Sequence, residues 1–229
     1  MPERVAVKID ADERVTATIY PAAPHVAAGI TLILAHGAGA GQASGFMVSF
    51  AAELAARGIN SVTFNFSYAE HGRRVPDRND RLEACYRAVI ESVRSHDTTG
   101  RGKLAIGGKS MGGRIASQVA AQRGCDVDGL VFLGYPLHPP GRPEQLRTRH
   151  LPGITAPMLF IQGSRDAFGT PDELRPVIES LAGRADLYVV GSGDHSFKVL
   201  KKAGVTQEAV YRSVLDHIDG WLRKTVAAS

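Results

Sequence analysis

The sequence predicts an α/β fold with a doubly wound, mostly parallel sheet and an antiparallel hairpin near its N-terminus. Short apolar runs recur along the chain, and each is followed by a glycine-rich turn and then by a helical period. The runs are apolar almost throughout, which is typical of parallel strands that helices cover on both faces. Six such units follow the hairpin, fewer than a closed (β/α) barrel requires, so we expect an open sheet.

The hairpin is predicted from two short segments that alternate in character. Residues 5–9 and 15–20 switch between apolar and polar side chains, and the polar stretch 10–14 separates them. Alternation on both sides of a polar turn is the usual signature of two antiparallel strands.

The parallel part of the sheet is predicted from residue 29 onward. We expect its strands at residues 30–35, 61–66, 103–106, 129–133, 157–161 and 185–190. Helices are expected near residues 47–58, 79–96, 111–123, 171–182 and 207–225. No repeat or linker interrupts this succession, so we expect a single domain over residues 1–229.

The segment 135–156 is the one long irregular stretch, and it is rich in proline and glycine. It leaves the end of a predicted strand, which is where ligands bind in open α/β sheets. Because the segment is short, we expect at most a minimal lid and an open site.

The composition is that of an ordinary soluble protein. Of the 229 residues, 44% are hydrophobic and 22% are charged, and the formal net charge is +4. No basic run is long enough to suggest a nucleic-acid partner, and no apolar run is long enough to suggest a membrane span. No signal peptide is recognisable and the two cysteines, Cys85 and Cys125, lie in no paired motif. We therefore expect free thiols and a cytoplasmic location.

The strongest chemical motif is G-x-S-x-G, formed by Gly108, Ser110 and Gly112. An apolar strand leads into it and a helix follows, which is the context in which a serine nucleophile stands on a sharp strand-to-helix turn. Small residues two places on either side let the strand and the helix approach each other. We expect Ser110 to be the nucleophile; the alternative is a structural glycine-rich turn with an incidental serine.

Two backbone amides are expected to form an oxyanion hole. Met111 begins the helix after the serine, where free N–H groups favour negative charge. The second donor should come from the glycine-rich loop after strand 30–35, and Ala38 is the best candidate there. His36 precedes this loop; it could act as a base, but a structural role in holding the loop is favoured.

A serine hydroxyl needs a base that a carboxylate orients. Asp166 and His195 follow two successive strands and therefore emerge at the same sheet edge as Ser110. We expect these three residues to form a catalytic triad. Should the acid be misassigned, Asp194 and Asp172 are the next candidates.

Further residues are candidates for touching a substrate. The candidates are Tyr68, Arg74, Arg114 and His138, with His150 as an additional one in the irregular segment. For Arg114, packing along the nucleophile helix is the competing interpretation. No spacing of His, Asp or Glu suggests a metal site, and no G-x-G-x-x-G opens a helix after the first parallel strand. We therefore expect neither a metal nor a cofactor.

The whole set of motifs resembles a known group. It comprises His-Gly-Ala-Gly (36–39), Asn-Phe-Ser-Tyr (65–68), Gly-Lys-Ser-Met-Gly-Gly-Arg (108–114), Gly-Tyr-Pro-Leu-His (134–138), Gly-Ser-Arg-Asp (163–166) and Gly-Asp-His (193–195). These motifs are similar to those of the small α/β-hydrolase-like group that includes a domain of a nonspecific-lethal chromatin-complex subunit, and more distantly to dienelactone hydrolases. The resemblance implies an almost lidless hydrolase with its triad on Ser110, Asp166 and His195, but no particular substrate.

Two features depart from the dienelactone hydrolases. Their nucleophile is a cysteine, whereas this chain has Ser110, and Lys109 before it is not their pattern. We therefore predict a serine hydrolase that cleaves a small ester, thioester or related acyl bond through an acyl-enzyme. The alternative, which the chromatin-subunit relative suggests, is a non-catalytic interaction module that keeps the fold. The sequence predicts no oligomeric state.

Overall fold

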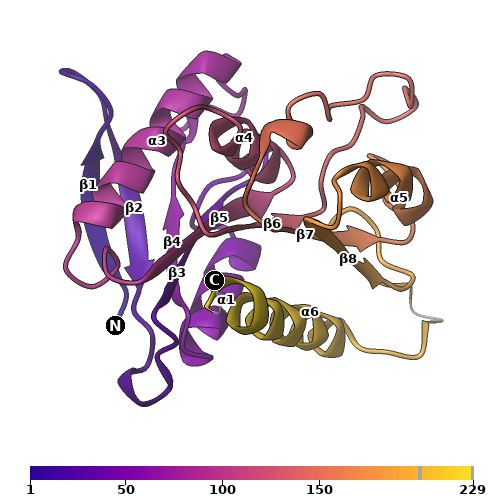
Figure 1. The fold of residues 1–229 in the computed structure, drawn as a ribbon. Helices are drawn as coiled ribbons and strands as arrows, with labels where there is room; N and C mark the ends of the chain where they lie inside the picture. The colour runs from indigo at the N-terminus through magenta and orange to yellow at the C-terminus, as the bar shows by residue number, and fades with distance from the viewer. Residues whose placement is uncertain (201–202, 228–229) are drawn as a thin grey trace.

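The computed structural model describes residues 1–200 and 203–227, and an eight-stranded sheet runs through them in the order β1-β2-β4-β3-β5-β6-β7-β8 (Figure 1). The strands are β1 (Glu3–Lys8), β2 (Arg14–Tyr20), β3 (Ile30–Ala35), β4 (Asn60–Phe64), β5 (Lys103–Lys109), β6 (Gly129–Leu133), β7 (Met158–Gly163) and β8 (Ala185–Val190). β1 and β2 pair antiparallel, β2 pairs antiparallel with β4, and all later pairs are parallel. The predicted fold class is confirmed.

Helices cover both faces of the sheet, and Figure 1 shows α1 and α6 on one face and α3 and α4 on the other. Their bounds are α1 (Gly45–Ala56), α2 (Ser67–Glu70), α3 (Asn79–Ser95), α4 (Met111–Ala120), α5 (Pro171–Ser180) and α6 (Gln207–Trp221). The described residues also form the short helical segments η1 (Pro24–Val26), η2 (Leu151–Gly153) and the π-helical η4 (Leu222–Val226).

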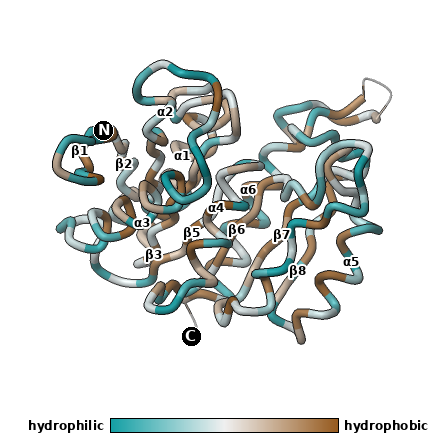
Figure 2. The backbone as a smooth tube through the Cα atoms, turned by 90° about the horizontal axis from the view of Figure 1, so that it is seen from above, coloured by the Kyte–Doolittle hydropathy of each residue, from teal (hydrophilic) through white to brown (hydrophobic). Residues whose placement is uncertain are grey.

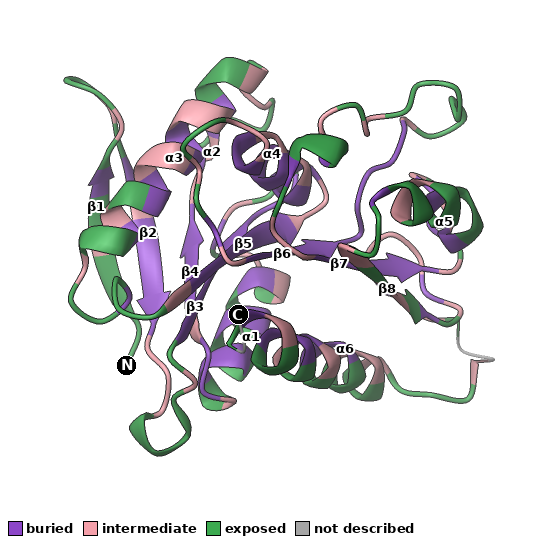
Figure 3. Cartoon of the chain, viewed as in Figure 1, coloured by how far each residue is buried: buried purple, intermediate pink, exposed green. Residues whose placement is uncertain are grey.

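The core consists of two main clusters, one on each face of the sheet. Along β6, Leu130 and Phe132 belong to the cluster under α3, α4 and α5, whereas Val131 and Leu133 belong to the cluster under α1 and α6. Every residue of β6 is buried, because alternate side chains meet helices on opposite faces (Figure 3). Figure 2 shows the same distribution, with apolar residues along the central strands and hydrophilic residues in the outer loops.

β5 is longer than its apolar pattern indicates. The apolar run ends at Ile106, but the strand continues through Gly107 and Gly108 to Lys109, pairing with β6 as far as Leu133. A Cβ on Gly107 would lie 1.9 Å from the carbonyl oxygen of Val131, so only glycine permits this close pairing. The extension brings the chain directly to Ser110.

Candidate active site

Ser110 stands on a sharp turn between β5 and α4. Its backbone has φ 52° and ψ −116°, a region that a residue with a side chain rarely adopts. A Cβ on Gly108 or on Gly112 would lie 2.3 Å from the carbonyl oxygen of Ala35 in β3. The two glycines of the motif are therefore required for the backbone to pass β3 at this distance. Such strain costs on the order of 1–3 kcal/mol and occurs mainly at functional sites.

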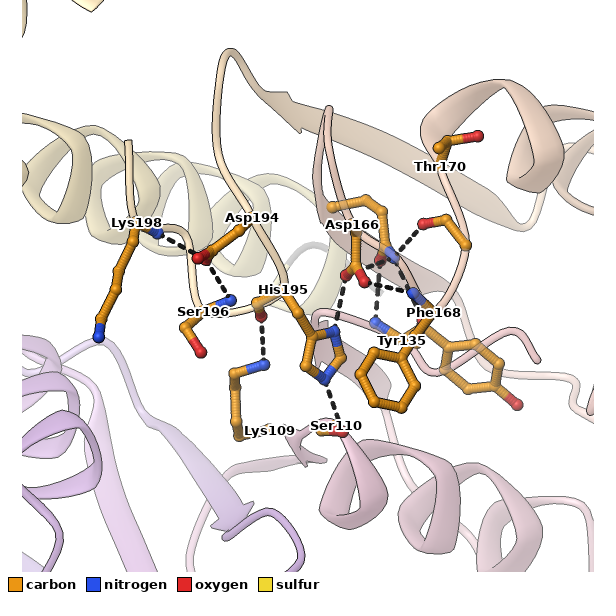
Figure 4. A network of polar contacts seen from close by, with 12 residues as sticks. Lys109, Ser110, Tyr135, Asp166, Phe168, Thr170, Asp194, His195, Ser196 and Lys198 are labelled. Atoms are coloured by element: carbon orange, nitrogen blue, oxygen red, sulfur yellow. Dashed lines mark hydrogen bonds and ion pairs between the residues drawn. The ribbon is translucent and has the colours of Figure 1, made fainter. Parts of the chain in front are cut away.

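Three side chains, from the loops after β5, β7 and β8, meet at the carboxyl edge of the sheet (Figure 4). Nε2 of His195 lies 2.8 Å from Oγ of Ser110, and Nδ1 of His195 lies 2.7 Å from Oδ2 of Asp166. Asp166 is 1% exposed, whereas the His195 side chain is 20% exposed. The structure thus brings together the three residues that the sequence assigns to a triad.

The Asp166 carboxylate is held from two further directions. Its Oδ1 accepts from the backbone N–H of Phe168 at 2.8 Å, and its Oδ2 also accepts from Nε2 of Gln162 at 2.9 Å. Gln162 is itself fixed, since its Oε1 accepts from the Tyr135 N–H at 2.9 Å. Gln162 was not among the predicted site residues. Its position was nevertheless a signal, because a polar residue directly follows the apolar run 158–161, and the structure shows that this side chain is fully buried.

The alternative acids point elsewhere. Oδ1 of Asp194 accepts from the backbone N–H groups of Ser196 and Lys198, at 2.8 and 2.9 Å, and so shapes the loop that carries His195. The Asp172 side chain is 94% exposed and lies 3.6 Å from Arg175. Neither carboxylate contacts the imidazole.

Lys109 supports the histidine loop from the nucleophile turn. Its Nζ donates to the carbonyl oxygen of His195 at 2.5 Å and lies 5.5 Å from the centre of the Phe197 ring. Burial lowers the pKa of Lys109 to about 8, although the carboxylates of Asp166 and Asp194 act in the opposite direction. The sequence analysis treated this residue only as a departure from the dienelactone hydrolase pattern.

Ala38 and Met111, the two residues expected to supply the oxyanion hole, line the same cavity as Ser110. Met111 is the first residue of α4, a position whose N–H has no partner within the helix. In the described part of the chain, the Ala38 N–H likewise donates to no protein acceptor. Two free amides next to a serine hydroxyl are the arrangement that a negatively charged oxygen requires.

His36 holds the loop that presents Ala38. The side chain is fully buried, its Nδ1 lies 2.9 Å from the carbonyl oxygen of Gly37, and its Nε2 accepts from the Phe66 N–H at 3.2 Å. These contacts assign the proton to Nδ1, and burial lowers the pKa of the imidazole. His36 contacts the loop and not Ser110, in agreement with the structural role that we expected.

A cavity of about 910 Å³ opens at Ser110. It is lined from α1 and α6 on one side of the sheet and from α3, α4 and the segment 135–156 on the other. Besides the residues already described, its wall includes Phe46, Met47, Asp77, Asn79, Arg114, Arg147, Lys198 and Tyr211. The volume suits a small molecule.

Of the four candidate substrate contacts, the structure places only Arg114 on this wall. Tyr68 is fully buried and its ring packs edge-on against His36, behind the loop. His138 is 4% exposed and its Nε2 lies 3.3 Å from Oε1 of Glu173. Arg74 lies on the exposed surface after α2 and does not line the cavity.

The additional candidate, His150, is also turned away from the cavity. Its Nε2 lies 2.7 Å from Oγ of Ser117, on the side of α4 that faces the segment 135–156. For Tyr68 and His138 the reason for the failed prediction is the same. Both are amphipathic side chains, and tertiary packing turned them into the interior.

Within residues 1–200 and 203–227, no group of three or more His, Cys, Asp or Glu side chains is arranged to hold a metal ion. No helix there has the length and apolar character needed to cross a bilayer. Cys85 and Cys125 are free thiols.

Comparison with known proteins identifies the family and similar folds. A family model described as an alpha/beta hydrolase domain matches residues 28–223. An α/β serine hydrolase without a lid from Xanthomonas campestris is 20% identical, with a TM-score of 0.77 over 100% of this chain and 96% of that one. A dienelactone hydrolase from Anabaena variabilis is 20% identical, with a TM-score of 0.75 over 99% and 98% of the two chains. An esterase from Pyrococcus furiosus is 13% identical, with a TM-score of 0.76 over 99% and 92%.

Proposed function

Because this chain belongs to the α/β-hydrolase domain family, we propose that it is a serine hydrolase that cleaves a small ester, thioester or related acyl bond. The observation that carries the proposal is the continuous chain of hydrogen bonds from Ser110 through His195 to Asp166, at 2.8 and 2.7 Å. Similarity to serine hydrolases and esterases supports the same reaction class.

In the proposed reaction, Oγ of Ser110 attacks the acyl carbonyl carbon while Nε2 of His195 takes the hydroxyl proton. The carbonyl oxygen becomes negatively charged and accepts hydrogen bonds from the Met111 and Ala38 amides. One such donor is typically worth about 3–4 kcal/mol in the transition state. The imidazolium then protonates the leaving group, and the acyl group stays on Ser110 until water removes it by the reverse proton transfers.

Asp166 serves the histidine and does not react. Its Oδ2 accepts the Nδ1 proton, so Nε2 is left free to receive the proton of Ser110. Burial of the carboxylate strengthens its interaction with the imidazolium that forms during the reaction. Gln162 and the Phe168 N–H keep the carboxylate in this orientation.

A fluorophosphonate probe tests the proposal directly, because it phosphonylates an activated serine. We expect labelling at Ser110 that is lost in Ser110→Ala and in His195→Ala. Ser44→Ala is a matched control, because Ser44 lines the same cavity without contacting His195. The Ser44→Ala protein should still be labelled at Ser110. Turnover of p-nitrophenyl esters of graded chain length should follow the same pattern of variants.

The proposal would be contradicted if the protein is folded, as shown by cooperative unfolding, but is not labelled by the probe and cleaves no ester or thioester. That result would favour the non-catalytic interaction module that the resemblance to the chromatin-complex group suggests.

A further inference from the structure

The two sides of the cavity differ in character. Phe46 and Met47 from α1 and Tyr211 from α6 give one side an apolar, aromatic wall, in which the Phe46 and Tyr211 ring centres lie 5.8 Å apart. The other side carries Arg114 from α4 and Arg147 from the segment 135–156. Figure 1 shows α1 and α6 on the opposite face of the sheet from α4, so the cavity extends across the sheet edge.

Arg114 lies one helical turn after the proposed nucleophile. Its backbone N–H donates to the carbonyl oxygen of Ser110 at 3.1 Å, and both residues line the cavity. Its Nη1 donates to the amide oxygens of Asn79 and Gln118, each at 3.2 Å. Both partners are neutral, and no carboxylate among the described residues forms an ion pair with Arg114.

Arg147 is held by its backbone and leaves its guanidinium free. Its N–H donates to the carbonyl oxygen of Leu137 at 2.8 Å, and its own carbonyl accepts from the Tyr135 hydroxyl at 2.8 Å. Within residues 1–200 and 203–227, its half-buried guanidinium makes neither an ion pair nor a hydrogen bond. Arg114 and Arg147 line the same cavity. Burial, followed by the charge of Arg147, lowers the pKa of Arg114, although the charges of Tyr135 and Glu83 act in the opposite direction.

The nearby carboxylates form no ion pair with either arginine. Asp77 lines the cavity; its Oδ1 accepts from Arg73 at 2.8 Å, and its buried Oδ2 has no partner among the described residues. Glu83 on α3 accepts from Gln122 at 2.6 Å and from Asn79, and its charge acts on Arg114 without direct contact. His150 adds no charge at neutral pH, because burial and then the charge of Arg114 lower its pKa to about 4. Among the described residues, the arginine pair therefore has no carboxylate in direct contact.

We propose that Arg114 and Arg147 form a subsite for the carboxylate or phosphate group of an anionic ester substrate, and that the aromatic side of the cavity receives an apolar group. Guanidinium groups bind both oxyanions through paired hydrogen bonds, which suits two cations that lack a partner. The inference rests on the proposed function, because it assigns a substrate class to the same site.

Binding to the Ser110→Ala protein tests the subsite without any turnover. Calorimetric titration with glutarate and with inorganic phosphate distinguishes a carboxylate site from a phosphate site. We expect one anion to bind, with an affinity that falls about tenfold or more in Arg147→Gln and in Arg114→Gln. Arg142→Gln, an exposed arginine of the same segment, should bind as tightly as its parent. No binding of either anion, or affinities that the two variants leave unchanged, would overturn the subsite.

Turnover then locates the anion on the substrate. The first pair, p-nitrophenyl hemiglutarate and its methyl-capped neutral ester, tests a carboxylate on the acyl group. The second pair, 4-acetoxybenzoate and its methyl ester, tests a carboxylate on the leaving group. In one of the two pairs, we expect the wild type to cleave the acid with a kcat/KM about tenfold or more above that of the neutral ester, and Arg147→Gln to lose that preference. The Arg142→Gln protein should keep it.

The two proposals can fail separately. If neither glutarate nor phosphate binds through the arginines, and acid and neutral esters are cleaved at equal rates, the subsite is refuted and the hydrolase stands. If glutarate or phosphate binds through the arginines but no ester is cleaved and Ser110 resists the probe, the hydrolase is refuted and the subsite stands.

Discussion

Nζ of Lys109 donates a hydrogen bond to the carbonyl oxygen of His195, so the residue before the proposed nucleophile fixes the backbone of the proposed base. The contact bridges two loops that are 86 residues apart in sequence. It holds the imidazole at hydrogen-bond distance from Ser110 without taking part in the proton transfers (Figure 4).

We predict that Lys109→Met changes the pH dependence of stability. The folded protein lowers the pKa of Lys109 from its usual 10.5 to about 8, so between these values the unfolded state binds more protons. The free energy of unfolding of the wild type should therefore gain a contribution that rises from about pH 8 to 10.5, with a slope of at most about 1.4 kcal/mol per pH unit. Urea titrations across this range should show the contribution disappear in Lys109→Met. Parallel curves for the two proteins would contradict the prediction.

Asp166→Asn should leave the fold intact and lower kcat by about 10⁴-fold, because the amide favours the wrong imidazole tautomer. Ester turnover together with circular dichroism checks this. The comparison variant is Asp194→Asn, which loosens backbone contacts within the histidine loop and should lower kcat far less. Should the two variants exchange their effects, the acid of the triad would be Asp194.

Gly112→Ala should destabilise the protein and misplace the nucleophile. The added Cβ would lie 2.3 Å from the carbonyl oxygen of Ala35 and 2.6 Å from its carbon, and these are backbone atoms that cannot move aside cheaply. Forced contacts of this kind cost about 1–3 kcal/mol or more. Gly220→Ala in α6 is the matched control, because nothing lies within 4 Å of its Cβ position. It should stabilise the helix by about 0.5–1 kcal/mol. Chemical denaturation measures both, and equal effects would refute the steric argument.

His150→Gln should make the protein less sensitive to acid. Burial and the charge of Arg114 lower the pKa of His150 from 6.5 to about 4, so the unfolded state binds more protons between these values. The wild type therefore loses stability as the pH falls from 6.5 to 4, by at most about 1.4 kcal/mol per pH unit from this group. Unfolding curves between pH 4 and 7 should show a shallower loss in the variant. An unchanged slope would mean that the imidazole is not the responsible group.

The architecture was predictable because burial on both faces of a parallel sheet leaves a strong mark on the sequence. Each residue of β6 and β7 is buried; β6 and the first four residues of β7 read as unbroken apolar runs. The spacing of Gly108, Ser110 and Gly112 was equally informative. The backbone of both glycines lies so close to the Ala35 carbonyl oxygen that no larger residue fits at either position. Chain order then placed Asp166 and His195 at the same edge.

The walls of the cavity were less predictable, because they depend on how loops fold back onto the sheet. Arg147 lies in a segment with no periodic pattern, so no feature of the sequence indicated that it reaches the cavity. Tyr68 and His138 looked like surface side chains and instead pack into the interior. The end of β5 was misjudged for a related reason, since glycines carry no apolar signal even where they pair within a sheet.

The hairpin β1–β2 lies at the sheet edge remote from β7 and β8, and none of its described residues lines the cavity. Its buried side chains, such as Val7 and Ile19, nevertheless belong to the core. In a mutational screen, substitutions in the hairpin should therefore lower the melting temperature, whereas substitutions of Ser110, Asp166 or His195 should abolish the proposed turnover in a protein that melts normally. A screen read only by activity at low temperature would overlook the first group.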